Sequence, residues 1–144
     1  MAAIGALRLN TGHGSVLAVA GAVLGVALVA LGAWRSGRWR PQRLAWCLYS
    51  GSLALLLGYS LRSDYVFGWD VSAEYSLLNH TILDGHWPVA HPGDAYGAML
   101  SLTVLPTFIS ALTGLSGLVI LKLVYPMIFA LTPIIAMAST AGRR

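Results

Sequence analysis

Residues 15–34 read SVLAVAGAVLGVALVALGAW, and residues 35–43 directly after them read RSGRWRPQR. The first stretch has 20 residues without a charge, enough helix to cross about 30 Å of hydrocarbon at about 1.5 Å per residue. The second stretch holds four arginines in nine residues, which is typical of the cytoplasmic end of a membrane span. Together they predict an integral membrane protein. Gly21 and Gly25 form a GxxxG pattern, which predicts that this span packs closely on another helix.

The composition of the whole chain agrees with a membrane protein. Of its 144 residues, 57% are hydrophobic and 10% are charged, whereas soluble domains carry about 25% charged residues. The net charge of +4 would also suit a nucleic-acid-binding protein. The arginines flank apolar stretches, however, as topology signals do, and we therefore expect no nucleic-acid partner. The single cysteine, Cys47, lies inside an apolar stretch and is expected to be inert packing.

Two further apolar stretches, about residues 44–61 and 115–140, are long enough to be spans. The positive-inside rule places the loop 35–43 in the cytoplasm, so that the N-terminus and the loop 62–98 face outward. A cleaved signal peptide is the alternative for the first span. Its apolar run exceeds the ~7–15 residues of a signal-peptide core, and the basic cluster follows it instead of preceding it. We therefore expect a retained helix and a multi-pass protein of the cell membrane.

Residues 99–140 contain three prolines and admit either one span or two. One span returns Arg143 and Arg144 to the cytoplasm, which the positive-inside rule favours. The stretch MLSLTVLPTFISALTG, residues 99–114, then forms a short helix that lies on the membrane surface or re-enters it, with a kink at Pro106. The predicted fold class is all-α, with about three membrane-spanning helices, an outer loop with an amphipathic surface helix, and this second short helix.

The outer loop gathers the groups that chemistry needs. All five acidic residues lie between Asp64 and Asp94, together with three of the four histidines. Residues 70–84 are predicted to form a helix that stops at Gly85, a residue suited to a left-handed cap. At about 100° per residue, two stripes are expected along this helix. The apolar stripe is Val71, Tyr75, Leu78 and Ile82, and the polar stripe is Asp70, Glu74, Thr81 and Asp84.

Asp70 and Glu74 stand four residues apart and share one face of that helix. Two carboxylates at this spacing can share a proton, which raises one pKa, or can hold a divalent cation through their oxygens. Each also has a structural interpretation. Aspartate ahead of an apolar-periodic helix is a preferred N-cap, and Glu74 would serve equally as a solvated helix carboxylate. The spacing alone leaves these alternatives open.

The other polar residues give weaker signals. The histidines His80, His86 and His91 lack the spacing of a metal site, and no HExxH pattern is present. Lys122 lies one to two turns inside the last predicted span. Its ammonium can reach back to the lipid headgroups or point into a polar site between helices, and both interpretations remain open.

Three motifs in order resemble the N-terminal part of the GT-C superfamily of polytopic membrane glycosyltransferases, in an uncharacterised prokaryotic branch. They are GWDVSAEY from Gly68, LSLTVLP from Leu100 and LKLVYPMIFALTP from Leu121. The resemblance covers about residues 44–133. The resemblance lies in the ordered combination of the three motifs.

The resemblance implies an essential aspartate in the first outer loop, which falls on Asp70, with Glu74 as a second acid. It implies a polyprenyl-phosphate sugar as donor, transferred at the outer face, and some members need a divalent cation that Asp70 and Glu74 would hold. Lys122 or Arg62 would offset the charge of the leaving lipid phosphate. The carboxylate would accept or orient the acceptor hydroxyl proton as the sugar carbon gains oxocarbenium character.

Members of that superfamily have many more spans than the three expected here. Residues 1–43 would be an N-terminal span with its basic loop, and residues 44–144 a truncated GT-C-like module. We therefore expect a fragment or truncated form that is inactive alone and whose partners are the bilayer, a lipid-linked sugar and further membrane helices in a separate chain. The alternative is a small polytopic scaffold or transporter-associated subunit without catalytic activity.

Overall fold

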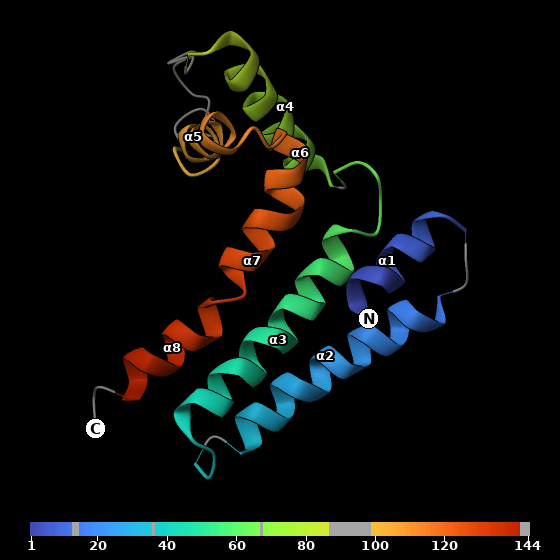
Figure 1. The fold of residues 1–144 in the computed structure, drawn as a ribbon, viewed down its shortest axis with the longest axis vertical. Helices are drawn as coiled ribbons and strands as arrows, with labels where there is room; N and C mark the ends of the chain where they lie inside the picture. Colours follow the sequence, from blue (N-terminus) through green and yellow to red (C-terminus); the bar gives the residue numbers. More distant parts are fainter. Residues whose placement is uncertain (13–14, 36, 67, 87–98, 142–144) are drawn as a thin grey trace. The chain divides into compact units, whose positions relative to one another are not determined.

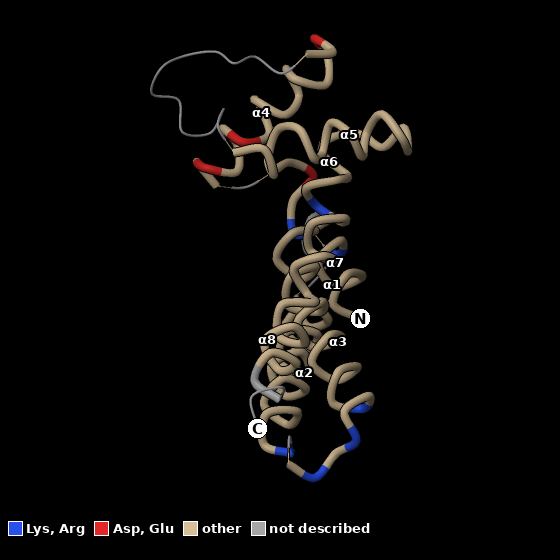
Figure 2. The backbone as a smooth tube through the Cα atoms, turned by 90° about the vertical axis from the view of Figure 1, so that its left-hand side faces the viewer, with Lys and Arg blue, Asp and Glu red and all other residues tan. Residues whose placement is uncertain are grey.

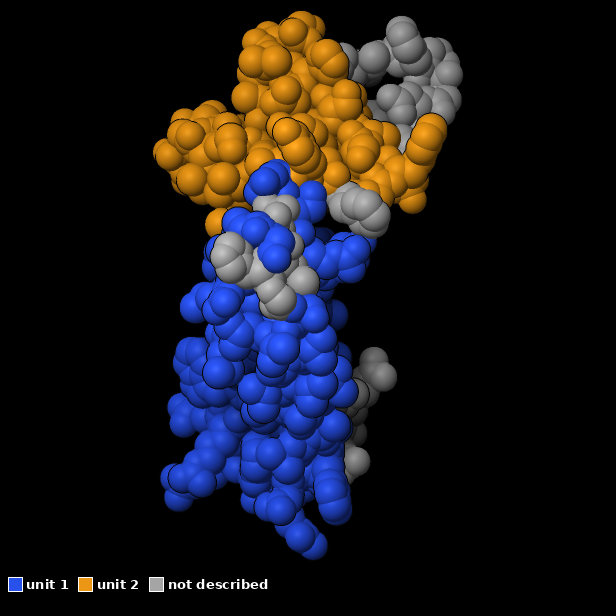
Figure 3. Space-filling model, turned by 90° about the vertical axis from the view of Figure 1, so that its right-hand side faces the viewer, with its two compact units in different colours: residues 1–64, 125–144 blue, residues 65–124 orange. Residues whose placement is uncertain are grey.

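The structure is a computed structural model and describes residues 1–12, 15–35, 37–66, 68–86 and 99–141 (Figure 1). These residues form helices and no strand, which confirms the all-α prediction. The helices are α1 (Ala2–Asn10), α2 (Val16–Trp34), α3 (Pro41–Ser60), α4 (Trp69–Asp84), α5 (Val104–Thr113), α6 (Gly117–Val119), the π-helix η1 (Ile120–Val124), α7 (Tyr125–Phe129) and α8 (Thr132–Ala141). They divide into two compact units (Figure 3). Unit 1 comprises residues 1–64 and 125–144, and unit 2 comprises residues 65–124.

Unit 1 is built on a hairpin of α2 and α3, and glycines set its spacing. A Cβ atom added at Gly21 would lie 2.8 Å from the Cα of Ala2 in α1, and one added at Gly25 would lie 3.2 Å from the carbonyl oxygen of Gly51 in α3. The two glycines of the GxxxG pattern therefore contact two different helices, Gly21 contacting α1 and Gly25 contacting α3. The backbones can approach so closely because glycine has no side chain. The predicted close packing of this span is confirmed.

Helix α1 was not expected from the sequence. Its small residues Ala2, Gly5 and Ala6 are buried against the hairpin, while the larger Ile4 and Leu7 are exposed. This is the reverse of a soluble amphipathic helix, in which large apolar residues face the core. The alanine and glycine spacing was the available signal, and it was hidden by the short length of the segment.

Two helical stretches are long and apolar enough to cross a membrane, namely Val16–Trp34 and Gly117–Ser139. They match the first and last predicted spans. The middle predicted span corresponds to α3, which has 20 residues but is not among the stretches that pass on length and hydropathy. It begins three residues earlier than expected, at Pro41, because proline suits the first position of a helix. Arg43 and several hydroxyl-bearing residues lower its hydropathy.

The last apolar stretch is interrupted at its prolines. Helix α7 ends at Phe129, four residues before Pro133, and a turn at residues 130–131 separates it from α8. A proline ring clashes with the carbonyl of the residue four positions earlier and has no N–H to bond it. Pro126 stands in the same relation to Lys122, which lies in the wider π-helix η1. The stretch is therefore not a single regular α-helix.

Pro106 does not kink a helix, and that expectation is wrong. Helix α5 begins at Val104, so Pro106 lies in its first turn, where backbone N–H groups have no intrahelical partner in any case. The carbonyl that its ring would crowd belongs to Leu102, which precedes the helix. Gly114, with φ 71°, ends α5 in the left-handed conformation.

Unit 2 packs α4 against α5 and α6. Its centre is Leu78 of α4, which is fully buried, against Gly117 of α6; a Cβ at Gly117 would lie 3.2 Å from Cδ2 of Leu78. Helix α4 begins one residue earlier than predicted and ends as predicted, since Gly85 caps it with φ 65°. This packing decides which face of α4 is shielded from water.

Candidate functional site

The N-terminal turn of α4 holds the candidate carboxylates. Gly68 is the N-cap, with φ 122°, a backbone conformation that side-chain-bearing residues rarely adopt, and it makes no side-chain cap bond. Asp70 is therefore the second residue of the helix and not its cap, so the capping interpretation is wrong. Its exposed carboxylate lies at the positive end of the helix dipole, which favours a negative charge.

Glu74 lies one turn further along and is half-buried. Burial raises the pKa of its carboxyl above the usual value of 4.5, and the charge of Asp70 raises it further. The cause is the rotation of α4, since Leu78 and Thr81 on the same side are buried. Thr81 was expected in the solvated polar stripe; instead its hydroxyl donates to the carbonyl of Leu77 at 2.9 Å inside unit 2. Glu74 thus combines partial burial with a nearby like charge.

Lys122 reaches the same end of α4 from a distant part of the chain. Its Nζ donates a hydrogen bond to the carbonyl oxygen of Tyr65 at 3.1 Å, and its side chain is only 8% exposed. The Lys122 side chain therefore points into unit 2. Whether it also meets lipid headgroups stays a prediction. The acceptor is a main-chain atom, which no side-chain motif could have indicated. The bond ties η1 to the loop that leads into α4.

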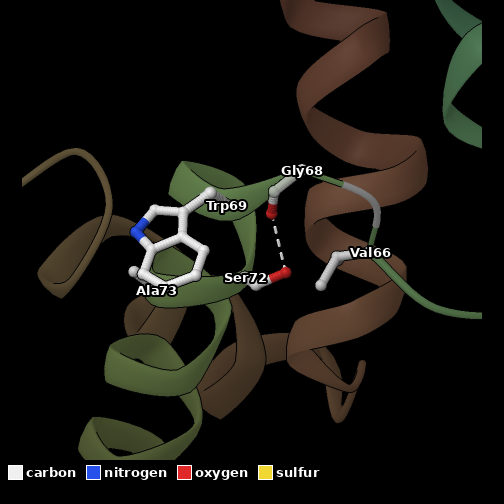
Figure 4. Close-up of a pocket in the computed structure, with 5 residues that line it drawn as sticks. All are labelled: Val66, Gly68, Trp69, Ser72 and Ala73. Atoms are coloured by element: carbon white, nitrogen blue, oxygen red, sulfur yellow. Dashed lines mark hydrogen bonds between the residues drawn. The ribbon is translucent and has the colours of Figure 1, made fainter.

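A cavity of about 700 Å³ opens beside this loop (Figure 4). Among the residues that the structure describes, Val66, Gly68, Trp69, Ser72 and Ala73 line it. Ser72 donates its hydroxyl to the carbonyl of Gly68 at 2.7 Å, which holds the first turn of α4 closed. Trp69 is 91% exposed, so its indole is available to an apolar ligand face or to lipid. Asp70 directly follows the lining residue Trp69 in the chain.

The other predicted residues are exposed or lie outside the described part of the chain. Arg62 is exposed and belongs to unit 1. His80 and His86 are exposed, and Nδ1 of His86 lies 3.1 Å from the carbonyl oxygen of Asp84 at the far end of α4. His91 and Asp94 lie outside the described residues. Across the described part of the chain, no three His, Cys, Asp or Glu side chains form a group that could hold a metal ion.

No protein-family model, curated protein or solved structure matches this chain. The resemblance to GT-C glycosyltransferases therefore rests on the three sequence motifs and stays a prediction. In the structure the first motif lies on the N-terminal turns of α4, the second runs into the start of α5, and the third covers η1, α7 and the start of α8.

Proposed function

We propose that this chain is an integral membrane protein whose outer segment handles a lipid-linked sugar. The support for membrane integration is the exposure of its most apolar helices. The best windows of Val16–Trp34 and Gly117–Ser139 have hydropathies of 2.5 and 2.2, yet only 17% and 22% of those windows are buried within the protein. In water, exposed apolar surface would cost about 25 cal/mol per Å², so these faces fit lipid.

Helix α5 supports a membrane-surface position for unit 2. Its ten residues are too few to cross about 30 Å of hydrocarbon. One face exposes the apolar side chains Val104, Leu105, Phe108 and Leu112. On the other face Thr103 is fully buried, and the Thr107 hydroxyl donates to the Thr103 carbonyl at 2.7 Å. A helix whose apolar face is turned outward suits the boundary between headgroups and acyl chains.

The proposed topology follows the charges. The four arginines of residues 35–43 gather at the loop between α2 and α3 (Figure 2). With that loop in the cytoplasm, α3 would be the remaining span and would lead outward to residues 62–98. The N-terminus would also face outward. The carboxylates of α4 would then act outside the cytoplasm, where polyprenyl-phosphate sugars serve as donors in the proteins that this sequence resembles.

The observation that carries the proposed activity is the Asp70–Glu74 pair. The two carboxyls lie one turn apart near the N-terminal end of α4, and burial together with the charge of Asp70 raises the pKa of Glu74. We infer that Asp70 accepts or orients the proton of an acceptor hydroxyl while the sugar leaves its lipid phosphate. Glu74 would relay that proton, since a raised pKa brings a carboxyl closer to operating pH. The pair therefore fits general acid–base chemistry.

The leaving phosphate would need a positive partner. As an alternative role for the pair, ionised Asp70 and Glu74 would hold a divalent cation together with the phosphate itself, as one or two carboxylates often do. Such an ion would neutralise the charge on the leaving group. Lys122 is the proposed cationic side chain for the same phosphate, and it would have to serve it while holding the Tyr65 carbonyl. Arg62 stays a prediction from the resemblance alone.

Complementation in living membranes tests the activity. Membranes from cells that lack the gene should lose one transfer from a radiolabelled polyprenyl-phosphate sugar, and the wild-type chain should restore it. Asp70→Asn should not restore transfer, although the protein inserts normally. Asp84→Asn, which removes an exposed carboxylate at the other end of the same helix, is the matched control and should restore it. Full restoration by Asp70→Asn would instead identify a scaffold subunit without catalytic residues.

A further inference from the structure

A second cavity lies in unit 1, beside the break between α7 and α8. It has a volume of about 340 Å³ and is lined by Ala45, Trp46, Tyr49, Leu131 and Ile134. This volume falls within the ~300–1,000 Å³ of small-molecule sites. The break that Pro133 imposes places Leu131 in a turn, so α3 is flanked here by an interrupted helix and not by a continuous one. The cavity is therefore a groove with an apolar wall on each side.

Aromatic rings form the α3 wall of this groove. Trp46 and Tyr49 meet edge to face, with ring centroids 6.4 Å apart at an interplanar angle of 82°. Trp46 is 69% exposed. Tryptophan and tyrosine are enriched where the hydrocarbon of a membrane meets its headgroups. Their position in the first half of α3 places the groove at the end of the span that carries the arginine loop.

Positive charge adjoins the groove at that end. Arg43 lies three residues before Trp46, one turn nearer the helix start and on the same face. Arg40 is the N-cap residue of α3, and both arginines are exposed. A guanidinium group binds phosphate oxygens in pairs, and basic clusters directly beside a span attract anionic lipids. Apolar walls ending in arginines match a molecule with a chain and an anionic head.

We propose that this groove binds an anionic glycerophospholipid of the cytoplasmic leaflet. One acyl chain lies between Trp46 and Ile134, and the headgroup phosphate contacts Arg43 and Arg40. The site rests on the membrane placement given above but not on sugar transfer. It is distinct from the α4 carboxylates in chemistry and belongs to the other compact unit.

The amount of lipid that stays bound to the purified chain tests this proposal. The full chain is transferred from vesicles of phosphatidylglycerol and phosphatidylcholine with identical chains into a mild detergent, and bound lipid is counted by native mass spectrometry. We expect phosphatidylglycerol to be retained in preference to phosphatidylcholine. Arg43→Gln should lower that retention about tenfold, as expected for loss of a charge-assisted hydrogen bond. Arg8→Gln makes the same charge change at the end of α1 and should have no effect.

Filling the groove is the second arm. Ala45→Phe places a ring between the walls and should reduce retention of both lipids, whereas Ala22→Phe, at an exposed position of α2, should not. Equal losses in Arg43→Gln and Arg8→Gln would show general charge attraction and overturn the proposal. Unchanged lipid retention in Ala45→Phe would also overturn the proposal. If the wild-type chain formed a dimer and Ala45→Phe lost it while lipid retention stayed the same, the occupant of the groove would be a second copy of the chain. Release of the wild-type chain by alkaline carbonate would refute the membrane placement separately.

Discussion

The raised pKa of Glu74 depends on which face of α4 is packed against the rest of unit 2. Its carboxyl stands on the side of α4 that also carries the buried Leu78 and Thr81, and Asp70 is one turn away. Water is partly withdrawn from a group that also has a like charge beside it, and both effects disfavour its ionised form. The same two effects make the stability of the folded protein sensitive to pH.

Glu74→Gln should reduce that sensitivity. Because folding raises the pKa of Glu74, its contribution to stability is fully present below pH 4.5 and is lost as the pH rises through the folded-state pKa. The wild-type chain should therefore lose stability relative to Glu74→Gln as the pH rises above 4.5. Thermal unfolding in detergent micelles, followed by circular dichroism, measures the difference. Parallel pH profiles for the two proteins would contradict the assignment, and Asp84→Asn serves as the exposed control.

Lys122 is expected to position the loop before α4. Its bond to the Tyr65 carbonyl joins residues 57 positions apart, and a hydrogen bond from a charged donor contributes about 1.5–3 kcal/mol. Lys122→Met should speed amide hydrogen exchange in residues 69–74 by about tenfold or more, because the first turn of α4 opens more often. Lys122→Arg keeps a donor and should restore most of the protection.

The amides of α3 provide the internal control for this exchange measurement. They belong to unit 1 and should exchange at wild-type rates in both variants. Unchanged exchange in residues 69–74 of Lys122→Met would show that the Lys122–Tyr65 hydrogen bond does not hold the first turn of α4 in place. Faster exchange in α3 as well would mean general loosening of the protein and not a local role.

At the scale of elements, the α2–α3 hairpin depends on a close backbone approach. A Cβ at Gly25 would lie 3.1 Å from Cγ of Leu55, and one at Gly51 would lie 3.0 Å from the Gly25 carbonyl. The hydrophobicity of the side chains does not specify this contact, because the residues of both helices near it are apolar or small. The glycines allow the two backbones to approach, and van der Waals packing between helices in lipid requires such closely fitting surfaces.

Gly25→Leu should destabilise the hairpin by about 1–3 kcal/mol, the cost of overpacking a filled interface. Gly58→Leu is the matched control because a Cβ there meets nothing within 4 Å, and it should be close to neutral. Unfolding in mixed micelles at rising SDS fraction, followed by circular dichroism, compares them. Equal midpoints for the two variants would show that α2 and α3 do not rely on this contact.

Several elements were predictable from local pattern, and others were not. The bounds of α2 and the end of α4 at Gly85 followed from hydropathy and from the preference of glycine for the left-handed cap. The role of Pro106 was predicted wrongly, because it depends on where the helix begins and not only on the absence of an N–H. Helix α1 escaped prediction because small residues form its packed face.

At the scale of the molecule, the proposed topology places opposite charges on opposite sides of the bilayer. Two single-cysteine variants test it, Gly37→Cys in the arginine loop and Ser76→Cys on α4, both at exposed positions. In intact cells a membrane-impermeant maleimide should label position 76 within minutes and position 37 only after permeabilisation. The wild-type chain is the blank, since Cys47 is buried. Labelling of position 37 in intact cells would reverse or reject the orientation.

The candidate site was only partly accessible to prediction. Asp70 and Glu74 share a helix face at a spacing that any reader of the sequence can measure. The half-burial of Glu74 needed the packing of α4 on Gly117, and the partner of Lys122 needed the course of the backbone at Tyr65. Neither has a signature in side-chain type.

The amino-acid sequence by itself determined helix α2, the end of α4 at its Gly85 cap and the apolar stretches, because hydrogen bonding within a turn and the transfer of side chains from water act over a few neighbouring residues. Tertiary structure alone decided which face of α4 is shielded, what Lys122 holds, and where the α7–α8 break leaves a groove along α3. Those features join residues dozens of positions apart, and only the packing of helices brings such residues within reach of one another.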